Sequence, residues 1–101
     1  MEEMAMVIDV HEMVIDVHEN VDRIKSFDFI EFIAFTGNRT IARVIFYDRS
    51  IQRIYGRVKH IQPDEKVLKY DDPIRVDAEI VIRVFPYRLE LEKLFLREAG
   101  L

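Results

Sequence analysis

The sequence contains no cysteine, so it can form no disulfide bond, thiolate nucleophile or cysteine-ligated zinc site. Its three glycines, Gly37, Gly56 and Gly100, are too far apart to form a glycine-rich loop that binds phosphate. No apolar stretch approaches the roughly 20 residues that span a bilayer, and the first four residues are acidic where a signal peptide is basic. We therefore expect a cytoplasmic protein with no membrane association.

The sequence shows no recognisable arrangement of catalytic groups. The few serines and threonines have no nucleophile motif around them, and His60 stands alone in a predicted strand. The paired carboxylates Asp71-Asp72 and Asp64-Glu65 lie in predicted turns, where aspartate is favoured because it hydrogen-bonds the local backbone. We therefore expect a protein that is not an enzyme and that holds no cofactor.

The chain of 101 residues fits one domain, and 50% hydrophobic with 34% charged residues is a globular composition. Its net charge of −4 is unevenly distributed. Residues 1–36 have a net charge of −7, residues 37–70 of +5, and residues 71–101 of −2. An acidic arm beside a basic middle indicates self-association, or competition between the arm and an anionic partner.

A perfect tandem repeat lies in the N-terminal arm. Residues 6–12, Met-Val-Ile-Asp-Val-His-Glu, recur unchanged as residues 13–19. Seven residues are nearly two helical turns, so a duplication keeps the same helix face inward, whereas in a strand it would reverse every side chain. The β-branched residues of the unit favour a strand instead. We favour a helix, whose apolar seam consists of Met6, Val10, Met13, Val17, Val21 and Ile24.

The same repeat contains potential metal ligands, namely Asp9, His11, Glu12, Asp16, His18 and Glu19. Zinc-binding helices place two histidines four residues apart, whereas these two are seven apart. We therefore interpret the repeat as a solvated acidic helix face and expect no metal site.

Residues 27–36 fit two local structures. Asp28 and Glu31 have the spacing of a capping box, and Gly37 is placed to end a short helix. The alternative is a strand that turns at residues 37–38 into the next strand. The spacing favours the helix, and the strand stays open as the alternative.

From residue 40 onward the sequence alternates as in β-strands. Residues 41–47 and 51–61 form two predicted strands joined by a turn, and Gly56 marks a bulge or bend in the second. Residues 66–70, 74–76 and 79–85 form further short strands, separated by turns. Four or five short strands with tight turns are typical of a small barrel.

A C-terminal helix is predicted after the last strand. Pro86 and Tyr87 open it, Arg88 and Glu92 form an i, i+4 pair, and Gly100 ends it. The predicted fold class is therefore α+β: a small β-barrel of four to five antiparallel strands with an N-terminal helical arm and a C-terminal helix. Residues 1–26 form the arm, and residues 27–101 form the barrel domain with its flanking helices. The side chains predicted to point inward are Val44, Phe46, Ile54, Val58, Leu68, Ile80, Ile82 and Val84, with Leu91, Leu94 and Phe95 closing one end.

One patterned surface is both basic and aromatic. Alternation along residues 51–61 places four of its members on one strand face, and two more lie on the corresponding face of the preceding strand. Interleaved Arg and Tyr hold phosphates and stack bases, and both residue types are enriched in protein-interface hot spots. The alternative is a sheet face that charge only protects from edge pairing. The candidate binding residues are Arg43, Tyr47, Arg53, Tyr55, Arg57 and Lys59.

Residues 40–84 resemble the YolD-like protein family. The resemblance rests on Phe46-Tyr47 and on residues 51–71, Ile-Gln-Arg-Ile-Tyr-Gly-Arg-Val-Lys-His-Ile-Gln-Pro-Asp-Glu-Lys-Val-Leu-Lys-Tyr-Asp. The family pattern there is two strand residues, a glycine, a strand, an acid-proline turn, a lysine and a second strand. Ser50, Gln62 and Arg75 stand where Gly, Asp and Pro are usual, and the helix after residue 86 is longer.

The resemblance implies an Sm-like barrel and a role beside the Y-family DNA polymerases of translesion repair. It implies no catalytic residues. We favour a protein-interaction module of DNA repair that docks its partner through the basic and aromatic surface. One alternative is a nucleic-acid-binding barrel that uses the same surface, although the net charge of −4 disfavours phosphate contacts. The other is a structural homo-oligomer, since the apolar arm and open sheet edges favour self-association.

Overall fold

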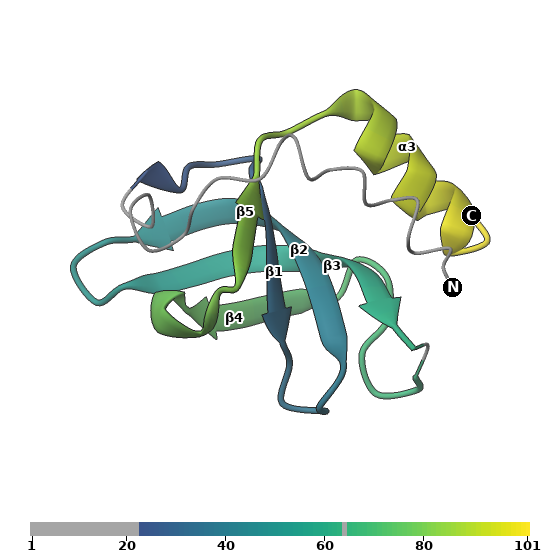
Figure 1. Cartoon of the computed structure of the whole chain (residues 1–101), viewed down its shortest axis with the longest axis horizontal. Helices are drawn as coiled ribbons and strands as arrows, with labels where there is room; N and C mark the ends of the chain where they lie inside the picture. Colours follow the sequence, from purple (N-terminus) through teal and green to yellow (C-terminus); the bar gives the residue numbers. More distant parts are fainter. Residues whose placement is uncertain (1–22, 64) are drawn as a thin grey trace.

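Five antiparallel strands form one sheet in the order β4-β3-β2-β1-β5, and a C-terminal helix packs on it (Figure 1). The computed structural model describes residues 23–63 and 65–101. Residues 1–22 of the predicted arm, with the repeat and its ligand-like side chains, lie outside this part. The α+β class is confirmed by the described elements. These are β1 (Phe29–Ile33), β2 (Arg39–Asp48), β3 (Arg53–Gln62), β4 (Pro73–Asp77), the 3-10 turn η3 (Ala78–Ile80), β5 (Arg83–Phe85) and α3 (Leu89–Glu98).

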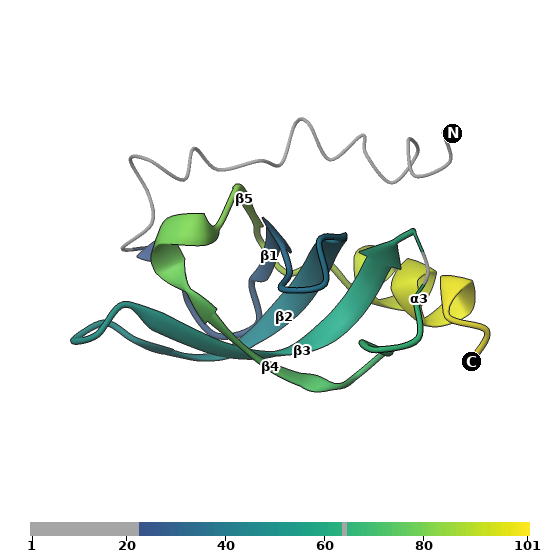
Figure 2. The ribbon, with the colours of Figure 1, turned by 90° about the horizontal axis from the view of Figure 1, so that it is seen from below.

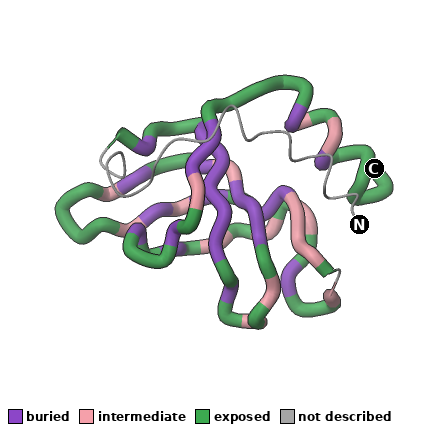
Figure 3. Tube along the Cα trace, viewed as in Figure 1, coloured by how far each residue is buried: buried purple, intermediate pink, exposed green. Residues whose placement is uncertain are grey.

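The sheet curls around one hydrophobic core and carries a second core on its outer face (Figures 2 and 3). In the outer core, Phe29, Ile41 and Phe85 lie on the sheet beneath Leu91 and Phe95 of α3. The two cores explain why β1 is buried along most of its length in Figure 3. The inner core consists of Ile24, Ile30, Phe32, Ala34, Ala42, Val44, Tyr47, Ile54, Val58, Leu68, Val76, Ala78, Val81 and Val84.

The helix predicted at residues 27–36 is wrong, and the strand alternative is correct. β1 lies between β2 and β5 and packs Phe29 into the outer core and Phe32 into the inner core. Hydrogen bonds to two neighbouring strands and burial of both faces outweigh a local capping signal. Gly37 then turns the chain with a φ of +89°, and its N–H donates to the Ala34 carbonyl at 2.8 Å.

Two irregularities interrupt the pairing of β2 with β3. β2 has an extra residue at Ile45, just before the pair formed by Phe46 and Tyr55, and β3 has one at Lys59. Because side chains alternate along a strand, one extra residue reverses every position that follows it. Phe46, predicted to point inward, is therefore 55% exposed, whereas Tyr47, predicted to point outward, lies in the inner core.

The chain between β4 and β5 differs from the strand predicted at residues 79–85. The 3-10 turn η3 interrupts it, so that Ala78 and Val81 are buried. Ile80 and Ile82, predicted to point inward, are exposed as a result. Besides these two and Phe46, the predicted inward set is buried, apart from Leu94, which is half-buried against the outer core.

Residues 66–70 form a bend that leads into a turn, and not the predicted strand, although Leu68 still packs into the inner core. The adjacent prediction at residues 74–76 is confirmed as the centre of β4. β4 pairs only with β3, and β5 pairs only with β1, among the described strands. The described sheet is therefore open, with β4 and β5 as its two edges.

α3 begins at Leu89, three residues after Pro86, where the helix was predicted to open. Its C-terminus has the hydrogen bonds of a Schellman motif around Gly100, which has a φ of +83°. The Gly100 N–H donates to the Arg97 carbonyl at 3.1 Å, and the Leu101 N–H donates to the Leu96 carbonyl at 3.2 Å. The predicted end of the helix is therefore confirmed.

Glu92 joins α3 to the sheet. Its Oε1 accepts a hydrogen bond from Arg43 Nη1 at 3.2 Å, and its Oε2 lies 3.4 Å from Lys59 Nζ. Arg88, the predicted partner of Glu92, contacts Glu90 instead at 3.5 Å. One carboxylate on α3 therefore holds two cations on β2 and β3.

We expect Glu92→Gln to lower the free energy of unfolding by about 2 kcal/mol, because the buried Lys59 ammonium loses a charged partner. The matched control is Glu90→Gln, two residues away on the same helix, whose side chain is 79% exposed. That control should leave the free energy of unfolding almost unchanged, because the Glu90 side chain is solvated. Urea unfolding measures both variants, and equal losses would contradict an anchoring role for Glu92.

At Gly56 the backbones of β2 and β3 approach each other closely, because a Cβ at this position would overlap the Arg43 carbonyl oxygen. We expect Gly56→Ala to cost about 2 kcal/mol of unfolding free energy, since the backbone itself must shift. Gly100→Ala is the comparison: its added Cβ meets nothing within 4 Å, and only the positive φ penalises it, by about 1 kcal/mol. Thermal or urea unfolding ranks the two, and a smaller loss at Gly56 would argue against the close approach.

Candidate binding face

The outer face of β2, β3 and β4 carries basic and aromatic side chains in cross-strand rows. One row joins Phe46, Tyr55 and Arg75, and the next joins Arg43 to Arg57. Arg53 lies at the far end of the same face. In Figure 2 these three strands form the lower side of the molecule, away from β5 and η3. We name this surface the basic–aromatic face; its residues are Arg43, Phe46, Arg53, Tyr55, Arg57 and Arg75.

The centre of the basic–aromatic face is a stacked pair of rings. The centroids of Phe46 and Tyr55 are 6.1 Å apart, and the rings are inclined by 26°. Arg75 is exposed and pairs with Tyr55 in the β3–β4 register. Among the residues that the structure describes, no carboxylate lies within ion-pair distance of Arg75. An apolar surface therefore lies beside an available guanidinium group.

The other three arginines of the face have contacts. Arg43 bonds to Glu92, and its guanidinium carbon lies 5.3 Å from the centroid of the Phe27 ring. Arg53 Nε lies 3.3 Å from a carboxylate oxygen of Asp77 on β4. Arg57 is exposed, and its Nη1 donates to the Asp71 carbonyl at 3.1 Å. Arg57 and Arg75 therefore keep the most capacity to bind an incoming anion.

Two aromatic side chains extend this surface toward α3. Phe27 is 57% exposed and meets Tyr87 edge to face, with centroids 6.2 Å apart. Tyr87 in turn stacks on the buried Phe29 at 5.7 Å. Because Arg43 lies over the Phe27 ring, these aromatics are continuous with the basic–aromatic face.

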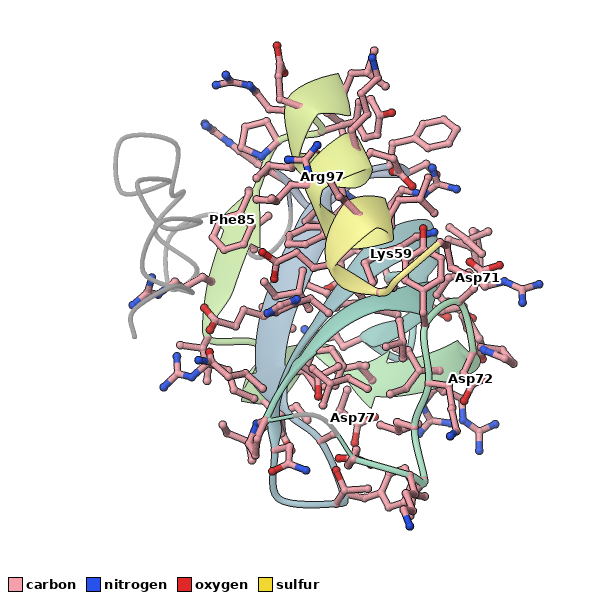
Figure 4. The ribbon with its side chains drawn as sticks, turned by 90° about the vertical axis from the view of Figure 1, so that its right-hand side faces the viewer. Lys59, Asp71, Asp72, Asp77, Phe85 and Arg97 are labelled. Carbon is pink, nitrogen blue, oxygen red and sulfur yellow. The ribbon has the colours of Figure 1, made fainter. Side chains whose placement is uncertain are left out.

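Two of the six predicted binding residues are not on this face. Tyr47 is 5% exposed and packs in the inner core, because the extra residue at Ile45 reverses its direction. Lys59 is also 5% exposed and lies beneath α3 (Figure 4). Both predicted placements are therefore wrong.

Lys59 is held by several groups at once. Its Nζ lies 3.1 Å from an Asp71 carboxylate oxygen, 3.4 Å from Glu92 Oε2 and 4.7 Å from the centroid of the Tyr70 ring. Burial alone would lower the pKa of Lys59, but the hydrogen bond to Asp71 and the charge of Glu92 raise that pKa above its ordinary value. Lys59 is therefore a charged structural group at neutral pH and not part of the accessible surface.

Arg43, Arg53, Tyr55 and Arg57 share one face as predicted, but Phe46 and Arg75 were not predicted to join them. The Phe46-Tyr47 pair carries a usable signal, since one of two successive aromatic side chains on a strand must point outward. Arg75 lies between Ile74 and Val76, a pattern typical of a strand with one buried face. Both residues could have been proposed from these local patterns.

Two of the clefts formed by the described residues adjoin the sheet. One, of about 250 Å³, is lined by Lys59, His60 and Glu98, with His60 packed against Phe95 at a centroid distance of 5.4 Å. The other, of about 420 Å³, includes Phe35 and lies between the β1–β2 hairpin and β4. Neither lining contains a serine or threonine. Across residues 23–63 and 65–101, no group of three or more histidine and acidic residues could hold a metal ion.

Within the described part of the chain, no helix is long and apolar enough to cross a membrane.

A scan against protein-family models, a search of curated proteins and a search of solved structures found no match to this chain.

Proposed function

We propose that this protein is a non-catalytic cytoplasmic binding protein whose basic–aromatic face docks a partner protein. The observation that carries the proposal is the stack of the exposed Phe46 ring on the half-buried Tyr55 ring, beside Arg75. Tyrosine and arginine concentrate binding energy at interfaces, because they bury a large planar surface and also form directed hydrogen bonds. The complementary partner surface is acidic, with an apolar or aromatic side chain at its centre.

A nucleic acid is the less favoured ligand of the same face. Its affinity depends chiefly on the number of phosphates that Lys and Arg neutralise. Here Arg43 already bonds to Glu92, and Arg53 already contacts Asp77. Two arginines suffice for a small acidic patch on a protein, whereas they are few for a polyanion.

The resemblance of residues 40–84 to the YolD-like family supports a class of partner. Under this proposal the partner is a Y-family DNA polymerase, and the chain is an accessory protein of translesion DNA repair. The resemblance also supports an Sm-like small barrel as the parent architecture. Strands β1 to β4 pair in chain order, and β5 returns to pair with β1. This topology is compatible with that proposal.

We expect Tyr55→Ala/Arg57→Ala/Arg75→Ala to weaken partner binding at least tenfold, because truncating interface Tyr and Arg typically costs about 2 kcal/mol or more. The matched control, Lys93→Ala/Leu96→Ala/Arg97→Ala, removes two cations and one large side chain from exposed positions of α3. Affinity capture from the source cell identifies the partner, and calorimetry with that purified partner compares the three proteins.

A titration with single-stranded DNA at several salt concentrations accompanies this comparison. Steep salt-dependent DNA binding that the triple variant loses would favour a nucleic-acid ligand instead. Retention of every partner by the triple variant would refute binding through this face.

The two open sheet edges support a second candidate function, a structural homo-oligomer. Each edge strand leaves backbone groups unpaired in the described part, and Ile80 and Ile82 are exposed in the link between β4 and β5. Light scattering over a range of concentrations should then give a mass that rises above the 12.1 kDa of one chain. A mass that stays at that of a monomer throughout would reject self-association.

A further inference from the structure

The first 22 residues carry an excess of negative charge that the rest of the chain does not share. Residues 1–22 contain seven Asp and Glu and no Lys or Arg. Residues 23–101 contain twelve acidic and fifteen basic residues, which is a net charge of +3. The negative net charge of the whole chain therefore comes from its first 22 residues, and the folded domain that follows them is basic.

The described domain begins against β2, the strand that carries Phe46. Ile24 is buried in the inner core, and its carbonyl accepts a hydrogen bond from Arg49 Nη2 at 2.7 Å. Ser26 Oγ donates to the carbonyl of Ile45 at 2.8 Å, one residue before Phe46. The acidic segment is thus tethered to the strand that carries half of the aromatic stack.

The tether is long enough to reach the whole face. An extended chain spans about 3.3 Å per residue, so a dozen residues cover roughly 40 Å. A five-residue strand such as β4 is only about 17 Å long. Short tethers give an effective concentration on the order of millimolar, so even weak contacts with Arg57 and Arg75 are populated.

We propose that residues 1–22 occupy the basic–aromatic face of their own chain and compete with an acidic partner. The carboxylates of the segment meet Arg57 and Arg75, which keep the most capacity to bind an anion among the described arginines of the face. The docking itself is independent of the proposed function, whereas the competition rests on it. Free protein is then self-inhibited, and only a partner that binds more tightly than the tethered segment displaces it.

The absence of native cysteine makes a direct test of the docking simple. The variant Ala5→Cys of the full chain accepts one nitroxide label, which broadens the NMR signals of nearby amides. We expect strong broadening at residues 55, 57 and 75 and little at residue 97, which lies on α3. At about 500 mM salt the broadening should largely disappear, because the charges are then screened over a few ångströms.

A charge-reversal pair identifies the surface that the segment contacts. Arg57→Glu/Arg75→Glu in the labelled chain should abolish the broadening, whereas Lys93→Glu/Arg97→Glu, with the same change of charge on α3, should preserve it. Equal effects of the two variants would overturn the proposal. Broadening centred on the exposed residues Ile33, Phe35 and Ile80 would overturn it too, because the segment would then dock by apolar contacts elsewhere.

Mixing a labelled chain with a separate isotope-enriched chain tests whether the contact is within one molecule. Broadening between the two chains as strong as that within one chain would overturn the intramolecular assignment. Its absence at the same concentration would support docking within one chain.

The competition is tested with a defined probe, a fluorescein-labelled peptide of three Glu-Glu-Tyr repeats. The variant Asp9→Asn/Glu12→Gln/Asp16→Asn/Glu19→Gln removes four of the seven charges and should bind the probe at least threefold more tightly at about 50 mM salt. Equal probe affinity for this variant and the wild type would overturn the self-inhibition and leave the proposed function standing. Probe binding by neither protein, with the nitroxide effect intact, would refute the proposed function and leave the docking standing.

Discussion

The pairing of β2 with β3 determines which side chains of these strands are exposed and which are buried. β3 lies between β2 and β4, in the middle of the exposed surface. At Gly56 its backbone approaches β2 so closely that no side chain fits. On either side of that approach one strand carries an extra residue, Ile45 in β2 and Lys59 in β3. The extra residue Ile45 directs the Phe46 side chain into solvent. The extra residue Lys59 is itself enclosed beneath α3. The irregular pairing of these two strands therefore exposes an aromatic ring and buries a cation.

Much of the β region follows from sequence periodicity, and its departures have identifiable causes. The alternation in residues 41–61 correctly predicts two long paired strands, because one face of each is buried. The segment that forms β1 is apolar on both faces, so alternation cannot distinguish it, and the local capping spacing favours a helix. The segment forms a strand only because it pairs with β2 on one side and with β5 on the other. Likewise, the 3-10 turn at Ala78–Ile80 has no local signal that separates it from a continuing strand.

Alternation predicts those residues of the basic–aromatic face that precede the irregularities in their strands. Arg53, Tyr55 and Arg57 follow simple alternation in β3 and lie together, as predicted. Tyr47 and Lys59 do not, because an extra residue in a strand depends on the geometry of the partner strand and not on the residue itself. The enclosure of Lys59 also requires Glu92, which is 33 residues later in the sequence and belongs to a different element. A charge that appears exposed on a strand can therefore serve to attach a distant helix.

The short link between β4 and β5 has a mechanical consequence. In a flat sheet of five strands the two edges would lie four strand spacings apart, about 19 Å. The link runs only from Asp77 to Arg83, and half of it is coiled as η3 with a rise of about 2 Å per residue, so it reaches roughly 16 Å. The sheet cannot flatten while this link holds its edges, even though no strand pairing joins them. The length of this link therefore limits how far the sheet can flatten, and so keeps the outer surface of β2, β3 and β4 convex.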